Sequence, residues 1–159
     1  MKMNVNNFYV FDMDGVMAEY GAVIDGKYHL NLTHSQLCSQ GLFLKKRPVL
    51  PVIARILTIG NCVYVLTAGP GRYAAEDKRK WLKGNLPWIN QENIFVVDNQ
   101  KQKVNKLETI FSIQKSLNPN IKKSNLILVD DDHEVLKQAE SLGYTAWHVS
   151  TFLTVNVFE

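Results

Sequence analysis

The chain contains a series of short segments that are apolar throughout instead of alternating between apolar and polar residues. A strand covered on one face alternates, whereas a strand covered on both faces is apolar along its whole length. Sheets covered on both faces are parallel sheets with helices on each side. We therefore predict buried strands at residues 8–11, 62–66, 94–97, 126–129 and 144–149.

Segments with helical spacing separate these strands. In residues 50–59, apolar side chains recur at intervals of three and four, Pro51 suits the first turn, and Gly60 suits the C-terminal stop. Similar patterns predict helices at residues 74–82, 104–117 and 133–142. This alternation predicts the α/β class, with a doubly wound, Rossmann-like parallel sheet. Sites in such sheets lie at the carboxyl ends of the strands.

Residues 17–47 do not follow the alternation. They are largely polar and weakly periodic, and we expect one short helix near residues 35–42. We interpret this segment as a small cap insertion after the first strand. The 159 residues suit one domain, so we predict a single domain over residues 1–159.

Composition excludes several classes of protein. The formal net charge of +3 is too small to favour nucleic acid as a partner, and we interpret the basic clusters at residues 45–47 and 78–83 as solvated surface. Cys38 and Cys62 form no C-x-x-C pair, which argues against zinc and redox motifs, and Cys62 is expected to be a buried thiol. We find no signal peptide pattern and no apolar stretch of membrane-spanning length, so we expect a cytoplasmic protein.

Four of the predicted strands are followed by residues suited to phosphate or metal. The parallel arrangement should bring these residues to one edge of the sheet. They are Asp12-Met13-Asp14-Gly15 after the first strand, Thr67-Ala68 after the second, Lys103 after the third and Asp130-Asp131 after the fourth.

These residue types suit attack on a phosphate ester. Asp12 could attack phosphorus, and Mg²⁺ held by Asp12 and Asp131 would offset the repulsion between the two anions. Asp14 could act as the acid and base, because residues two apart in an extended chain point to the same face. Thr67 could donate its hydroxyl to the phosphate, and Lys103 could neutralise its charge.

The run Phe11-Asp12-Met13-Asp14-Gly15-Val16 resembles the first motif of the haloacid-dehalogenase-like (HAD) superfamily. Thr67, Lys103 and Leu128-Val129-Asp130-Asp131 resemble its second, third and fourth motifs, in the same order. The resemblance implies a HAD-like fold and a phosphotransfer activity that uses Mg²⁺.

The resemblance also implies a role for each residue. Asp12 would be the nucleophile and a metal ligand. Asp14 would be the acid and base, with its backbone carbonyl on the metal. Asp131 would bind the metal directly, and Asp130 through water or as a partner of the ligands. Phosphate would be bound by Thr67, Ala68 and Lys103.

Residues 12–20 are further similar to the start of 5'(3')-deoxyribonucleotidases, although the insertion here is shorter. That similarity implies a nucleotidase, and Tyr20, Phe43 and Trp88 are aromatic candidates for a nucleoside pocket. The expected partner is a small phosphorylated substrate, with a homodimer as a further expectation and no membrane partner.

Several alternatives remain open from the residues alone. Thr67 and Asp132 could be helix caps, and Lys101 and Lys106 compete with Lys103 for the phosphate site. Asp12 and Asp14 could belong to a calcium loop, although no EF-hand ligand set follows them. A receiver-like or catalytically silent domain that binds phosphate or metal is the alternative function. The order of the acidic motifs favours the hydrolase.

Overall fold

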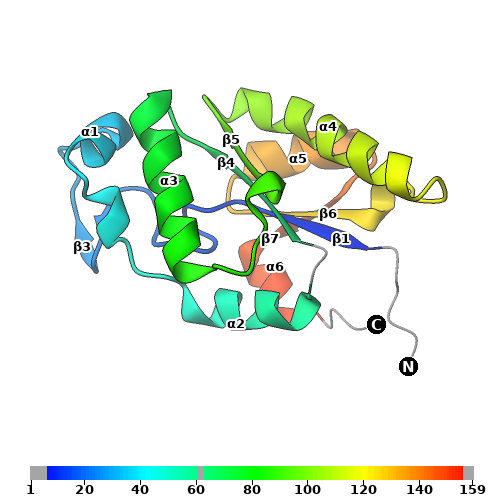
Figure 1. The fold of residues 1–159 in the computed structure, drawn as a ribbon, viewed down its shortest axis with the longest axis horizontal. Helices are drawn as coiled ribbons and strands as arrows, with labels where there is room; N and C mark the ends of the chain where they lie inside the picture. The colour runs from blue at the N-terminus through cyan, green and yellow to red at the C-terminus, as the bar shows by residue number, and fades with distance from the viewer. Residues whose placement is uncertain (1–6, 61–62, 156–159) are drawn as a thin grey trace.

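The computed structural model describes residues 7–60 and 63–155, and it contains a five-stranded sheet in which every neighbouring pair is parallel (Figure 1). The strand order is β5-β4-β1-β6-β7. In chain order the strands are β1 (Phe8–Phe11), β4 (Val63–Ala68), β5 (Ile94–Val97), β6 (Leu126–Asp130) and β7 (Thr145–His148). β1 is central, and Tyr9 pairs with Val63 on one side and Ile127 on the other.

Helices cover both faces of this sheet. One face packs against α2 (Leu50–Ile59), α3 (Gly71–Asn85) and α6 (Val149–Thr154), and the other against α4 (Lys101–Leu117) and α5 (His133–Ser141). Along β1, Phe11 points into the first core and Val10 into the second, and both are fully buried. Each such side chain contributes about 1.5–3 kcal/mol through burial, which explains why the strands are apolar throughout.

The predicted α/β class and parallel sheet are therefore confirmed, with differences at the element ends. β4 continues through Thr67 and Ala68, while Cys62 lies outside the described residues. α3 runs past Gly84 to Asn85, because its last carbonyls accept bonds from the Asn85 side chain and the Leu86 N–H. α4 begins at Lys101, three residues before the predicted start. Residue 149 begins α6, which the pattern did not predict.

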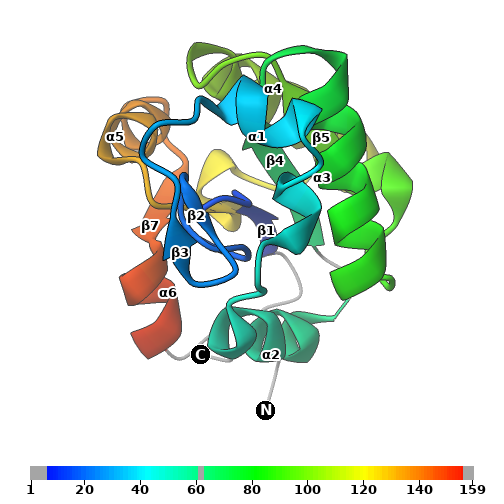
Figure 2. The same cartoon turned by 90° about the vertical axis from the view of Figure 1, so that its left-hand side faces the viewer.

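The insertion between β1 and α2 lies beyond the carboxyl ends of the strands, blue to cyan in Figure 2. It contains a hairpin of β2 (Val23–Ile24) and β3 (Lys27–Tyr28), the helix α1 (His34–Ser39) and a short 3₁₀ turn η1 (Phe43–Lys45). α1 corresponds to the predicted short helix and packs against α3.

The hairpin was not predicted, although the two-residue loop Asp25-Gly26 is the usual sequence signal for one. Both residues have positive φ, 49° and 75°, as a tight hairpin turn requires. The two ends of the insertion are joined at its base, where the Val49 N–H donates to Met17 O at 2.8 Å and the Glu19 N–H donates to Arg47 O at 3.1 Å.

Within residues 7–60 and 63–155, no helix combines the length and the apolar character needed to cross a membrane.

Candidate active site at the carboxyl edge of the sheet

Three adjacent strands deliver the predicted site residues to one edge. Asp12 directly follows β1, Thr67 and Ala68 end β4, and Asp130 ends β6. Because β4 and β6 flank β1 in parallel register, the three strand ends are neighbours. The edge predicted from the sequence therefore exists in the fold.

An acidic cluster occupies this edge. Asp12, Asp130 and Asp131 each present one carboxylate oxygen, and these oxygens lie within 4.8 Å of one another. Asp12 and Asp130 are 3% and 0% exposed, and Asp131 is half-buried. Three converging carboxylates form an oxygen donor set of the kind that a hard divalent cation prefers.

Lys103 lies against two of these carboxylates. Its Nζ is 2.9 Å from Asp12 Oδ1 and 2.9 Å from Asp130 Oδ2, and its side chain is fully buried in the first turn of α4. Lys101 is exposed instead, and the Lys106 Nζ lies 5.6 Å from the centre of the Phe95 ring. Of the three candidate lysines, Lys103 is therefore the one in contact with the acidic cluster.

One ammonium group does not balance the cluster. Burial, followed by the nearby charge of Asp12, raises the pKa of Asp130 to about 7. Burial and Asp12 also raise the pKa of Asp131. Burial alone would lower the pKa of Lys103, but the charges of Asp12 and Asp130 raise it above its ordinary value. Burial and crowding thus raise the carboxyl pKa values of Asp130 and Asp131 even with Lys103 present. A bound cation would supply the positive charge that these acids lack.

Gly15 makes room for the cluster. Its φ is +76°, and a Cβ at this position would lie 2.2 Å from Asp131 Oδ2 and 2.8 Å from Asp131 Cγ. Any other side chain would therefore displace Asp131 and strain the backbone. The cradle for Asp131 depends on a residue without a side chain.

Asp14 is not part of the acidic cluster. Its placement beside Asp12 required an extended backbone, but the chain bends at Met13, whose carbonyl accepts the N–H groups of Met17 and Ala18. Asp14 nevertheless lines the same cavity as Asp12 and Asp131. Asp12 and Asp14 thus line the same cavity but contact different lysines.

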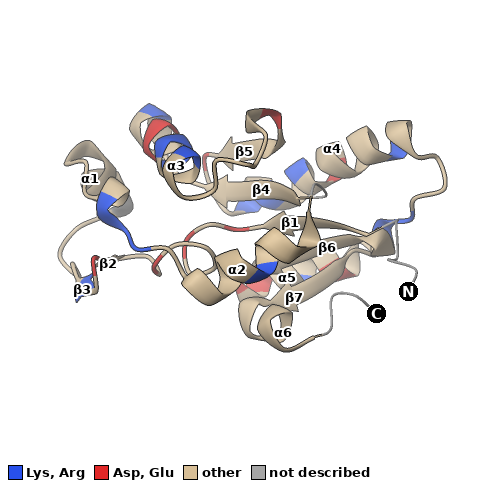
Figure 3. Cartoon of the chain, turned by 60° about the horizontal axis from the view of Figure 1, so that its bottom comes forward, with Lys and Arg blue, Asp and Glu red and all other residues tan. Residues whose placement is uncertain are grey.

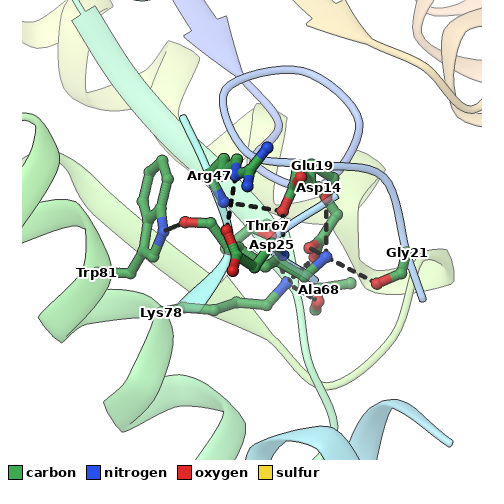
Figure 4. A network of polar contacts seen from close by, with 10 residues as sticks. Asp14, Glu19, Gly21, Asp25, Arg47, Thr67, Ala68, Lys78 and Trp81 are labelled. Atoms are coloured by element: carbon green, nitrogen blue, oxygen red, sulfur yellow. Dashed lines mark hydrogen bonds and ion pairs between the residues drawn. The ribbon is translucent and has the colours of Figure 1, made fainter. Parts of the chain in front are cut away.

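Two buried lysines, Lys46 and Lys78, hold Asp14 (Figure 4), and for these two residues the interpretation of the basic clusters as solvated surface is wrong. Other members of the same clusters are exposed as predicted, namely Lys45, Arg47, Lys80 and Lys83. Lys46 Nζ lies 2.8 Å from Asp14 Oδ1, and Lys78 Nζ lies 2.6 Å from Asp14 Oδ2; both lysine side chains are 0% exposed. Burial alone would raise the pKa of Asp14, but Lys78 and Lys46 lower it below its ordinary value. Figure 3 draws a blue, basic stretch of chain between α1 and α2. Lys46, which belongs to this part of the chain, is buried.

One of these lysines left a signal in the sequence. Lys78 lies three and four residues before Trp81 and Leu82, so helical spacing puts all three on the same face of α3. Because Trp81 and Leu82 are buried, this spacing indicates a buried Lys78. Lys46 has no such signal, because its partners come from residues 14, 19 and 21, outside its own element.

Thr67 and Ala68 end β4 beside the cavity in different ways. Thr67 is completely buried, and its Oγ1 accepts a hydrogen bond from Lys78 Nζ at 2.8 Å. Ala68 lines the cavity and offers its carbonyl to the same ammonium at 2.6 Å. Asp132, the other suspected cap, accepts the N–H groups of Glu134 and Val135, so its prediction as the cap of α5 is confirmed.

The cavity at this edge has a volume of about 350 Å³, within the range of small-molecule sites. Of the three aromatic candidates, Tyr20 lines it and is 66% exposed. Phe43 is buried in the core, and Trp88 lines a separate hollow with Gly60 and Ile89.

The chain was also compared with models of known protein families and with curated proteins, and neither comparison found a match.

Proposed function

We propose that the chain is a magnesium-dependent phosphohydrolase of the HAD type, which cleaves a phosphate monoester through an aspartyl-phosphate on Asp12. The observation that carries this proposal is the cluster of Asp12, Asp130 and Asp131 with Lys103 in contact with it at the carboxyl edge of a parallel sheet. A reaction through an aspartyl-phosphate needs a carboxylate nucleophile beside a cation, and the three converging carboxylates at this edge support both roles.

The balance of charges at this edge supports a cation that binds before the phosphate substrate does. The acids Asp12, Asp14, Asp130 and Asp131 outnumber the three lysines that contact them by one negative charge when all are ionised. Asp98, which also lines the cavity, adds a second. Such a site repels a phosphate dianion. The oxygens of Asp12, Asp130 and Asp131 would hold Mg²⁺, whose chemistry is to offset charge on the phosphoryl oxygens. The two charges of the ion would then offset this excess, and the repulsion of phosphate would be removed.

The chain's own residues would divide the reaction as follows. An Asp12 oxygen forms a bond to phosphorus while the bond from phosphorus to the leaving oxygen breaks. In the second step a water oxygen bonds to phosphorus, the bond to Asp12 breaks, and Asp14 takes the proton from the water. Lys103 restrains Asp12 and offsets its charge.

The state of Asp14 bears on the substrate. Its lowered pKa keeps it ionised, which opposes proton donation in the first step and leaves it able to accept a proton in the second. Leaving groups that depart as stable anions, such as aryl oxides, therefore fit the site best. The cavity is also large enough for a nucleotide, with Tyr20 at its wall, so a nucleotidase activity belongs to the proposal.

A receiver-like domain is the alternative function, and the strand order counts against it. Numbered along the chain, the sheet strands lie in the order 3-2-1-4-5, as in dinucleotide-binding folds, whereas receiver domains have the flavodoxin-like order 2-1-3-4-5. A catalytically silent phosphate-binding domain would retain the same edge and differ only in turnover.

Turnover is therefore the decisive measurement. We expect Mg²⁺-dependent release of 4-nitrophenolate from 4-nitrophenyl phosphate, with EDTA abolishing it. Asp12→Asn should lower kcat by about a thousandfold or more, since it removes the nucleophile. Asp25→Asn is the matched control, because Asp25 is exposed on the hairpin and Asn tolerates its positive φ.

Absence of turnover with Mg²⁺ across aryl phosphates, sugar phosphates and nucleotides would contradict the proposal. Retained activity in Asp12→Asn would contradict the assignment of the nucleophile.

A further inference from the structure

The carboxylate of Asp14 is gripped from two sides by lysines that come from distant parts of the chain. Lys46 belongs to the end of the insertion and Lys78 to the middle of α3, 32 and 64 residues from Asp14. Their Nζ atoms also lie 5.3 Å and 5.5 Å from the centre of the Phe43 ring, which is itself fully buried. The bridge is therefore shielded from water on the lysine side.

Neither ammonium group has a hydrogen left for a substrate. A lysine ammonium has three donors. Lys46 donates to Asp14 Oδ1 and to the carbonyls of Glu19 and Gly21, at 2.7–2.8 Å. Lys78 donates to Asp14 Oδ2, Thr67 Oγ1 and the Ala68 carbonyl, at 2.6–2.8 Å. Both lysines can therefore act only through the groups they hold.

The groups held by Lys46 form one wall of the cavity. The carbonyls of Glu19 and Gly21 flank Tyr20, and Tyr20 and Gly21 both line the cavity. Lys46 itself is anchored, because the Trp81 Nε1–H donates to its carbonyl at 2.8 Å. The ammonium group of Lys46 thus joins this wall directly to Asp14.

Lys78 holds two groups at the end of β4, one of which lines the cavity. An ammonium can only donate, so Thr67 Oγ1 accepts from Lys78, and the hydroxyl hydrogen of Thr67 remains free for another acceptor. The carbonyl of Ala68, which lines the cavity, is fixed by the same ammonium.

Stability alone does not account for this arrangement. Burying two ammonium groups costs desolvation energy, and apolar replacements of buried ion pairs are often neutral or stabilising. The bridge instead joins the end of β1, the end of β4 and the insertion at the cavity where Asp12 lies.

We propose that Lys46 and Lys78 are positioning residues for the reaction proposed above, on which this inference rests. They hold Asp14 at the cavity, and Lys46 also fixes residues 19–21 as its wall. Through this lysine, the end of the insertion acts on the site in addition to the part that lines the cavity.

The test uses Lys46→Met and Lys78→Met, which keep the length of the side chain and remove its charge. Lys45→Met and Lys80→Met are matched controls, because both lysines are exposed and lie beside the tested positions. Amide hydrogen exchange, which needs no activity, should be faster in residues 14–21 of Lys46→Met and unchanged in the Lys45→Met control.

Rapid-mixing kinetics with 4-nitrophenyl phosphate supply the second measurement. A misplaced Asp14 slows attack by water but not the first attack by Asp12. Both variants should therefore release one equivalent of 4-nitrophenolate in a burst and then turn over about ten- to a hundredfold more slowly than the wild type. A merely structural defect would reduce the burst amplitude and the later rate together.

Unchanged hydrogen exchange in Lys46→Met would overturn the inference. So would a proportional loss of burst and steady-state rate, or kinetics equal to those of the controls. A wild-type protein without turnover would refute the proposed function and with it the positioning role, whereas an active wild type with unaffected variants would refute the positioning role alone.

Discussion

Replacing Lys103 with Met should destabilise the protein strongly, because it leaves two buried acids without their cation. The side chain of Lys103 is 0% exposed, and the side chains of its partners Asp12 and Asp130 are 4% and 0% exposed. Lys103 Nζ lies 2.9 Å from a carboxylate oxygen of each partner. Breaking a buried ion pair by removing one partner costs about 3–5 kcal/mol. For a chain of this length, that corresponds to a fall in Tm of roughly 6–20 °C.

The assay is urea unfolding at pH 8 in EDTA, where the pKa of Asp130, about 7 with Lys103 in place, leaves this carboxyl largely ionised in the wild type. Lys101→Met serves as the control, since this exposed lysine in the same turn of α4 should change the free energy of unfolding by less than about 0.5 kcal/mol. Adding Mg²⁺ should stabilise Lys103→Met more than the wild type. In the variant, the carboxylates of Asp12, Asp130 and Asp131 have lost the ammonium group that contacts their cluster in the described part of the chain, so the ion offsets a larger repulsion.

A loss below about 1 kcal/mol for Lys103→Met, or a loss equal to that of Lys101→Met, would refute the reasoning from burial. Equal stabilisation of both proteins by Mg²⁺ would count against a cation among the three carboxylates.

Two further perturbations probe the same edge. The pKa of Asp130 is raised by burial and Asp12 above its unfolded value, so this group stabilises the fold at low pH and the contribution is lost as pH rises from about 4 to about 7. Asp130→Asn should remove that part of the pH dependence in EDTA, and an unchanged urea–pH profile would disprove the assignment. Gly15→Ala should weaken Mg²⁺ binding by calorimetry at least about tenfold, because its Cβ would collide with Asp131, and should also destabilise the fold by about 1 kcal/mol or more. Gly41 has a similar φ of +67°, and among the described residues a Cβ added there would have no atom within 4 Å. Gly41→Ala therefore isolates the backbone strain, and equal Mg²⁺ affinity in the two variants would exclude the collision with Asp131.

Part of this site followed from local sequence alone. Strands buried on both faces must be apolar throughout, so β1 and β6 could be recognised without knowing their neighbours. Parallel strands joined by helices end at the same edge of the sheet, which brings Asp12 and Asp130 together wherever their strands are adjacent. The acidic cluster was therefore predictable from position relative to strand ends.

The surroundings of Asp14 were not predictable in this way. The local pattern allowed an extended chain from Asp12 to Asp14, but the bend at Met13 depends on bonds to Met17 and Ala18 that close a turn after the strand. Similarly, Asp25-Gly26 marked a hairpin, yet only the fold sets that hairpin beyond the strand ends.

The sequence by itself determined the sheet, its site edge and the identity of the acids there. The tertiary structure decided which lysines contact these acids, and for Lys46 the sequence carried no signal at all. Lys103 differs from Lys101 and Lys106 only in the direction that α4 gives it, and Lys46 stands in a basic run that is otherwise typical of a solvated surface. A lysine is buried only where acceptors for its three hydrogens converge, and those acceptors come from segments that the fold must first bring together.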